Sequence, residues 1–188
     1  MRIFRSTKIL SLTLFLLAAI VSALGRPYTA TLALAESPND SGPPAACPVT
    51  RAPNPPFVPP APYPASPGPD PGAFWFGTQK LWTSLPTSGE WSGLRGFNST
   101  DLSYRQKLFW WRQGFYWLAE PRPKLIVTGR QLHASEPPLI VSGPNAGYRE
   151  QDTKSFMVVA VDFPTLGCWE ITGDYQGDKL SFVVWVAQ

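Results

Sequence analysis

The chain has 188 residues, with 16 Lys and Arg against 13 Asp and Glu, a formal net charge of +3, and two cysteines. Four of the basic residues and none of the acidic ones lie within residues 1–35, so the rest of the chain carries a formal charge of −1. A near-neutral chain lacks the cationic surplus on which nucleic-acid binding depends. We therefore expect no nucleic-acid partner.

Residues 1–35 have the layout of a signal peptide. Three basic residues, Arg2, Arg5 and Lys8, precede an uncharged, largely apolar run over residues 9–24. A basic segment followed by a short apolar run is typical of secretory signals. The run is shorter than the ~20 residues that a membrane-spanning helix needs.

Two sequences of the form small-x-small are candidate signal cleavage sites, and they end at Ala23 and at Ala35. The second is the better match to the Ala-x-Ala pattern of signal cleavage sites. It predicts an exported chain that begins at Glu36 and is secreted, periplasmic or held at the cell surface. The alternative is an uncleaved N-terminal helix that keeps the chain near the membrane.

Residues 36–72 form a proline-rich arm or linker, because they hold 14 of the 22 prolines. Proline lacks a backbone donor and has a fixed φ, so the segment cannot join a sheet or helix over any length. Polyproline II conformation is the expected state. Cys47 lies in this arm, too far beyond the apolar run to be the lipidated cysteine of a lipoprotein.

Residues 73–188 predict a single all-β domain. They contain all eight tryptophans, and their β-rich runs are short and separated by Pro and Gly. Such spacing favours an antiparallel, immunoglobulin-like β-sandwich, with a small β-barrel as the alternative. The predicted strands cover residues 74–77, 80–85, 102–111, 115–118, 124–132, 139–142, 154–163, 168–173 and 179–187.

The sequences of the last two predicted strands indicate where the arm is attached. Because side chains alternate along a strand, Trp169 and Ile171 share one face and Cys168 lies on the other. Two cysteines in an exported chain usually pair, so we expect a Cys47–Cys168 disulfide, with two free thiols as the alternative. Strands 154–163 and 179–187 are apolar on both faces. The arm is therefore expected to fold over an outer face, unless dimerisation covers it.

Catalytic motifs are sparse, and we expect no cofactor and no metal. His133 is the only histidine, and no Gly-x-Ser-x-Gly elbow or Gly-rich phosphate loop occurs. Asp174 with Asp178, and Glu150 with Asp152, could act as the acid and base of a glycosidase. Both pairs fall in predicted turns, where charged side chains are normally solvated, so a non-catalytic protein is favoured over an enzyme.

Three tryptophans are the candidate ligand-binding residues. Trp110 and Trp111 are adjacent on a predicted strand, so their rings cannot both face one core. One of them could form a sugar-stacking platform with Trp117. Burial of the second ring beneath the arm or a loop is the alternative, and it is favoured because tryptophan is largely buried in folded proteins. Asn98 begins a glycosylation sequon.

Several segments carry a distinctive set of motifs: Trp75-Phe76-Gly77-Thr78, Leu81-Trp82-Thr83, Lys107-Leu108-Phe109-Trp110-Trp111-Arg112, Val127-Thr128-Gly129-Arg130, and the run from Phe163 through Gly167-Cys168-Trp169-Glu170-Ile171-Thr172-Gly173. With Cys47-Pro48-Val49-Thr50, this set resembles a family of uncharacterised exported bacterial proteins over about residues 73–188. The resemblance implies a bacterial envelope setting, in which Asn98 stays unmodified. It implies no activity and assigns no functional residue.

Three functions are compatible with these features. The first is a non-catalytic binding or interaction module of the cell envelope, with an envelope or extracellular partner. The second is a carbohydrate-binding module that uses Trp110, Trp111 or Trp117. The third is a hydrolase with an atypical carboxylate pair, Asp174 and Asp178.

Overall fold

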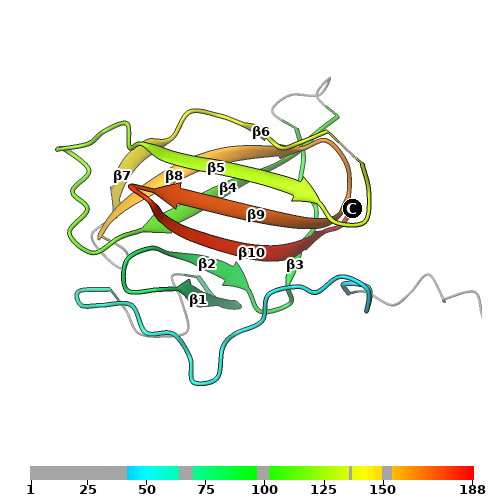
Figure 1. The fold of residues 1–188 in the computed structure, drawn as a ribbon, viewed down its shortest axis with the longest axis horizontal. Helices are drawn as coiled ribbons and strands as arrows, with labels where there is room; N and C mark the ends of the chain where they lie inside the picture. The colour runs from blue at the N-terminus through cyan, green and yellow to red at the C-terminus, as the bar shows by residue number, and fades with distance from the viewer. Residues whose placement is uncertain (1–41, 64–69, 97–101, 136, 150–153) are drawn as a thin grey trace, which may run out of the picture. The chain divides into compact units, whose positions relative to one another are not determined.

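The computed structural model describes residues 42–63, 70–96, 102–135, 137–149 and 154–188, and these residues form two facing β-sheets without a helix (Figure 1). The predicted signal peptide lies outside the described residues, as does Asn98. No helix among the described residues is long and apolar enough to cross a membrane. The strands are β1 (Ala73–Gly77), β2 (Trp82–Pro86), β3 (Glu90–Trp91), β4 (Tyr104–Trp111), β5 (Leu125–Gln131), β6 (Ile140–Val141), β7 (Asn145–Arg149), β8 (Lys154–Phe163), β9 (Gly167–Tyr175) and β10 (Asp178–Val186).

The strand order confirms the predicted sandwich. One sheet has the order β1-β2-β4-β8-β6, with β7 also paired to β8, and the other has the order β3-β10-β9-β5. The order β2-β4-β8-β6 opposite β10-β9-β5 matches the ABED and GFC sheets of immunoglobulin domains. The pairs are antiparallel, apart from the short parallel pair of β3 with β10. The sheets do not close into a barrel.

Several local expectations differ from the structure. Strand β3 has no predicted counterpart, and Asp174 and Asp178 lie in β9 and β10, not in the predicted turn. The strand predicted over residues 115–118 is wrong, because that segment forms turns and Phe115 packs edge-on against the ring of Tyr175. Strand β7 has no predicted counterpart, because its sequence, Asn-Ala-Gly-Tyr-Arg, has little β propensity. Its position depends on tertiary packing: a Cβ at Gly147 would lie 2.4 Å from the Phe156 ring.

The core lies between the sheets and is rich in aromatic rings. Trp110 of β4 and Trp169 of β9 are both fully buried. The indole of Trp110 lies directly over β9, since a Cβ at Gly173 would come within 2.5 Å of its Cη2. In β8, Met157, Val159 and Val161 face this core. The sheets therefore pack around large, closely fitted rings.

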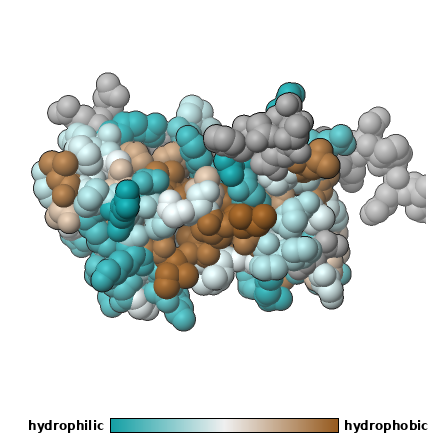
Figure 2. Space-filling view, turned by 90° about the horizontal axis from the view of Figure 1, so that it is seen from above, coloured by the Kyte–Doolittle hydropathy of each residue, from teal (hydrophilic) through white to brown (hydrophobic). Residues whose placement is uncertain are grey.

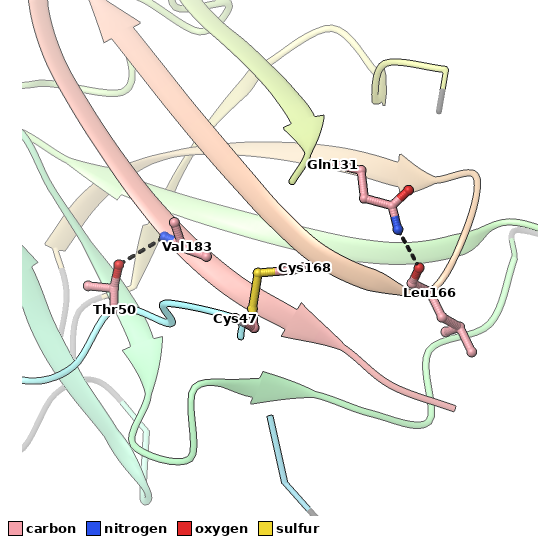
Figure 3. Close-up of a disulfide and its surroundings, with 6 residues drawn as sticks. All are labelled: Cys47, Thr50, Gln131, Leu166, Cys168 and Val183. Atoms are coloured by element: carbon pink, nitrogen blue, oxygen red, sulfur yellow. Dashed lines mark hydrogen bonds between the residues drawn. A yellow bond between two sulfur atoms is a disulfide. The ribbon is translucent and has the colours of Figure 1, made fainter. Parts of the chain in front are cut away.

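The first part of the arm is joined to β9 and β10, as predicted. Cys47 and Cys168 form a disulfide with a Cα–Cα distance of 5.6 Å. Beside it, the Thr50 amide donates to the Val183 carbonyl at 2.8 Å, and the Val183 amide donates to Thr50 Oγ1 at 2.8 Å (Figure 3). Strand β3 pairs only with Trp185 and Val186. Thr50 therefore extends the edge of β10 where β3 does not reach.

The next arm residues hold the turn through which the chain passes from one sheet to the other. The Arg51 guanidinium donates to the carbonyl of Thr87 at 3.2 Å and to that of Ser88 at 2.9 Å. Val49 packs on Gly89, where a Cβ would lie 2.7 Å from its Cγ2 and where φ is +73°. The turn between β2 and β3 is thus tied to the arm.

The second part of the arm lies on the outer face of the sheet that contains β1, β2 and β4. Tyr63 meets Trp82 edge-on, with ring centroids 5.0 Å apart, and its hydroxyl lies 3.4 Å from the Ser155 carbonyl to which it donates. Burial raises the pKa of Tyr63. Beneath it, Trp75, Trp82 and Trp111 form a buried cluster. The arm therefore lies over an outer sheet face, as predicted, through Phe57 and Tyr63, and the residues beneath it are Trp75, Trp82 and Trp111.

Loss of the disulfide is expected to release this arm. Replacing both Cys47 and Cys168 by serine removes a cross-link between residues 121 positions apart, which is worth about 4–5 kcal/mol in the chain-entropy account. Thermal unfolding should shift to lower temperature, and trypsin should cleave after Arg51 faster than in the oxidised parent chain. Unchanged cleavage and unchanged unfolding would show that the non-covalent contacts alone hold the arm.

Candidate functional site

A pocket opens where strands β2 and β4 separate. The two strands pair only at Trp82 with Trp111 and at Thr83 with Trp110. Beyond Thr83, β2 continues as far as Pro86 in pairing with β1. The chain then crosses to the opposite sheet and returns to β4 at a single bridge between Arg95 and Arg105. The pocket beside the separated strands has a volume of about 330 Å³, at the lower end of the roughly 300–1,000 Å³ that is usual for small-ligand sites.

The lining of the pocket is mainly apolar and combines residues of the core with residues of the outer sheet face. Its buried part includes Leu85, Trp91 and Leu108. Three outer-face rings complete it: Phe109 meets Phe156 edge-on at 5.3 Å and stacks on Trp111 at 6.2 Å. Phe109 is 37 % exposed. A flat or branched apolar group of a ligand can therefore contact these three aromatic rings when it enters the pocket.

The polar residues of the lining carry more positive than negative charge. Lys107 and Arg149 line the pocket together with one acidic residue, Asp70. Next to it on the outer face, Arg105 binds Asp162 through two hydrogen bonds of 2.6 Å, so this carboxylate is already neutralised by its partner. The formal charge of the described lining residues is therefore +1, from Lys107 and Arg149 against Asp70.

The three predicted aromatic residues do not come together as one site. Trp110 is fully buried in the core, and Trp111 is 2 % exposed, covered from outside and bordering the pocket. Their indole N–H groups have no acceptor among the described residues. Trp117 is half-buried and lies parallel to Tyr148, with centroids 6.4 Å apart and an interplanar angle of 20°.

Sequence reasoning missed the pocket because it selected tryptophans and overlooked the phenylalanines beside them. The alternation of β4 places Phe109 on the same face as Lys107 and Trp111. The alternation of β8 likewise directs Phe156 outward. No sequence signal shows that β2 leaves β4 after Thr83.

The candidate acid pair is engaged in ion pairs at the last hairpin. Asp174 lies 3.6 Å from Lys179 Nζ and accepts a hydrogen bond from the Gly177 amide. Asp178 lies 3.4 Å from Lys80 Nζ and 3.8 Å from Arg112 Nη1. The carboxylates of Asp174 and Asp178 therefore stabilise the hairpin through ion pairs. Neither of them lines the pocket.

The remaining candidates also lie apart from the pocket. Glu150 and Asp152 fall outside the described residues. His133 is exposed, in a turn after β5, with φ of +66°. Within the part of the chain that the structure describes, no group of three or more His, Cys, Asp or Glu residues is placed to hold a metal ion.

A second apolar surface follows the edge of the sandwich where β5 and β6 lie. Figure 2, which views the molecule from above, shows a hydrophobic band between polar side chains. The exposed apolar residues of these strands are Ile126, which is 62 % exposed, and Ile140, which is 64 % exposed. The Leu139 amide donates to the Gly129 carbonyl at 3.4 Å and so covers part of the β5 edge. The pocket between β2 and β4 is not lined by residues of this edge.

A buried tyrosine joins the loop after β4 to the last hairpin. The Tyr175 hydroxyl donates to the Glu120 carboxylate, and the side-chain Nε2 of Gln176 donates to the Tyr175 hydroxyl oxygen at 3.1 Å. Arg112 lies over the same ring, 5.2 Å from its centroid. Burial, followed by the hydrogen bond and the negative charge of Glu120, raises the pKa of Tyr175 to about 12.

This pKa predicts a loss of stability at high pH. Unfolded tyrosine ionises near pH 10.0, whereas folded Tyr175 ionises near 12. The unfolded state therefore loses its proton first, and the stabilisation, complete below pH 10, declines as the pH rises towards 12. Denaturant unfolding at pH 8, 10 and 11 should show this decline. A Tyr175→Phe variant should show a smaller one, and equal declines in both proteins would contradict the assignment.

Comparisons with protein-family models, curated proteins and solved structures find no match to this chain. The functional assignment therefore depends on the geometry and chemistry of the sites described above.

Proposed function

We propose that this chain is a non-catalytic binding module of an exported protein and that the pocket between β2 and β4 is its binding site. The observation that carries the proposal is the pocket itself, in which buried apolar residues and three aromatic rings are combined with Lys107 and Arg149. An apolar concave site with a few polar groups is the usual form of a small-ligand site. The disulfide is compatible with export, since such bonds persist in oxidising compartments.

The charges and the rings together indicate the chemistry of the ligand. Apolar groups gain free energy by leaving water for the aromatic part of the pocket. A carboxylate or another anion on the same ligand meets Lys107 at the rim. The ion pairs made by Asp174 and Asp178 favour this binding role over hydrolysis by these two residues.

Carbohydrate binding is the second candidate, and one observation favours it. The rings of Trp117 and Tyr148 lie nearly parallel, and Tyr148 is about half exposed. Parallel exposed rings can stack on the apolar face of a sugar. This pair does not line the pocket, so the two candidates predict binding at different places.

Binding of aromatic carboxylates distinguishes the candidates. We expect phenylbutyrate and indole-3-acetate to shift the amide resonances of Lys107, Phe109 and Phe156 in ¹H–¹⁵N NMR spectra. Replacing Phe109 by alanine removes one wall of the pocket and should weaken this binding by about three- to ten-fold, which corresponds to about 0.7–1.4 kcal/mol.

The matched control is Tyr148→Ala, which removes an exposed ring elsewhere and should leave carboxylate binding unchanged. The same spectra are recorded with soluble xylan and peptidoglycan fragments. Shifts confined to Trp117 and Tyr148 upon addition of a saccharide, with none in the pocket, would replace the proposed function by carbohydrate binding. No shift with any probe would contradict both.

A further inference from the structure

The loop that joins β4 to β5, residues 112–124, carries exposed apolar side chains at one end of the sandwich. It lies at the end where β9 turns into β10 (Figure 1), since β5 begins opposite Tyr175. In this loop Tyr116 is 55 % exposed and Leu118 is 57 % exposed. Trp117, between them, is half-buried against the ring of Tyr148. Neighbouring exposed apolar side chains mark a candidate interaction surface.

The β4–β5 loop is held to the domain on both sides of these residues. Phe115 is buried in the core. The Tyr116 carbonyl accepts from the Ala119 amide at 3.1 Å, which closes a turn at the tip of the loop. The Pro121 carbonyl accepts from the Ala146 amide of β7 at 2.9 Å. Folding therefore fixes both halves of the loop and leaves the tip in water.

The charges of the loop are unbalanced toward the positive. Its one acidic residue is engaged within the domain, because the Glu120 carboxylate accepts from the Tyr175 hydroxyl and, at 2.8 Å, from the Lys124 amide. The side chains of Arg122 and Lys124 are exposed, and neither forms an ion pair with another described residue. The loop thus combines an apolar tip with two unpaired cations.

This combination is typical of a surface that binds at the interface of an anionic membrane. Trp and Tyr are enriched at membrane–water interfaces, because each ring has an apolar body and a polar edge. Interfacial binding increases with the apolar area that is buried and with the electrostatic attraction to anionic lipids.

Other occupants match the loop less well. A neutral polysaccharide offers no counter-charge to Arg122 and Lys124, and Leu118 has no polar atom to bond its hydroxyls. A second copy of the same loop would bring like charges together. The pocket between β2 and β4 is not lined by residues of this loop, so its ligand is a separate matter.

We propose that the β4–β5 loop docks the domain on an anionic lipid surface. Tyr116 and Leu118 enter the interfacial layer, and the ring of Trp117 lies at its boundary. Arg122 and Lys124 pair with lipid phosphate groups. This inference goes beyond the proposed binding of a ligand in the pocket and does not depend on it.

The test uses the chain from Glu36 onward, so that the apolar run over residues 9–24 does not itself bind lipid. This chain contains all of the compact unit formed by residues 39–188. It should co-sediment with vesicles of equal parts phosphatidylglycerol and phosphatidylcholine. Vesicles of phosphatidylcholine alone should bind at least about ten-fold more weakly, because they lack the negative surface charge.

Variants at exposed residues separate the two contributions. Leu118→Ser should weaken binding to the anionic vesicles by about five- to ten-fold, because less apolar area is buried. Its matched control is Leu102→Ser, at an exposed residue before the start of β4, the opposite end of the sandwich. Lys124→Gln should weaken binding by about three- to six-fold. Its matched control is Arg95→Gln, an exposed cation that also lies near the start of β4. Both controls should stay within about two-fold of the parent chain.

Bicelles of the same lipids, doped with a gadolinium-chelating lipid, locate the contact. In ¹H–¹⁵N NMR spectra the amide resonances of residues 116–119 should lose intensity first. Loss centred on β5 and β6 around Ile126 and Ile140 would place the lipid elsewhere and contradict the proposal.

Three further outcomes would overturn the proposal. The first is equal binding to both kinds of vesicle, or binding that Leu118→Ser and Lys124→Gln leave unchanged. The second is no vesicle binding together with saccharide-induced shifts of Trp117 and Tyr148, which would identify a sugar as the occupant. The third is self-association that Leu118→Ser abolishes, which would identify a second copy of the chain. Phenylbutyrate binding in the pocket is measured separately, so either proposal can fail alone.

Discussion

The Cys47–Cys168 disulfide is the constraint on which the outer surface of this domain depends. The arm is too rich in proline to form a regular strand, so it cannot hold its place by sheet pairing along its length. One covalent bond and the paired contacts of Thr50 with Val183 fix its start. From there, Tyr63 reaches the opposite sheet and covers Trp82. A segment with the composition of a linker thereby becomes part of the folded domain.

The same arm borders the region that contains the candidate site. Arg51 and Val49 hold the turn through which the chain leaves β2 for β3. The space beside β4 opens before this turn, where β2 separates from β4 after Thr83. Tyr63 and Trp82 cover one end of the aromatic outer face, whereas Phe109 and Phe156 stay partly exposed. Structure and proposed function are therefore linked: the arm closes most of the aromatic face, and the pocket lies where the face remains open.

Local sequence patterns predict much of this fold, because the alternation of side chains in a strand is a local property. It assigns Cys168 and Trp169 to opposite faces of β9 and shows that β8 is apolar on both faces, which implies a cover. It does not reveal β7, whose residues have little β propensity and pair with β8 through tertiary packing around Gly147. Nor does it reveal the pocket, which depends on the point at which β2 separates from β4. Both are non-local features.

Amide hydrogen exchange at Val183 shows whether the disulfide holds the arm as an edge of the sheet. This amide donates to Thr50 Oγ1 and has no other described acceptor. We expect slow exchange in the oxidised chain and much faster exchange after reduction, while amides within the β9–β10 pairing remain protected. Fast exchange at Val183 in the oxidised chain, or protection that reduction leaves unchanged, would contradict it.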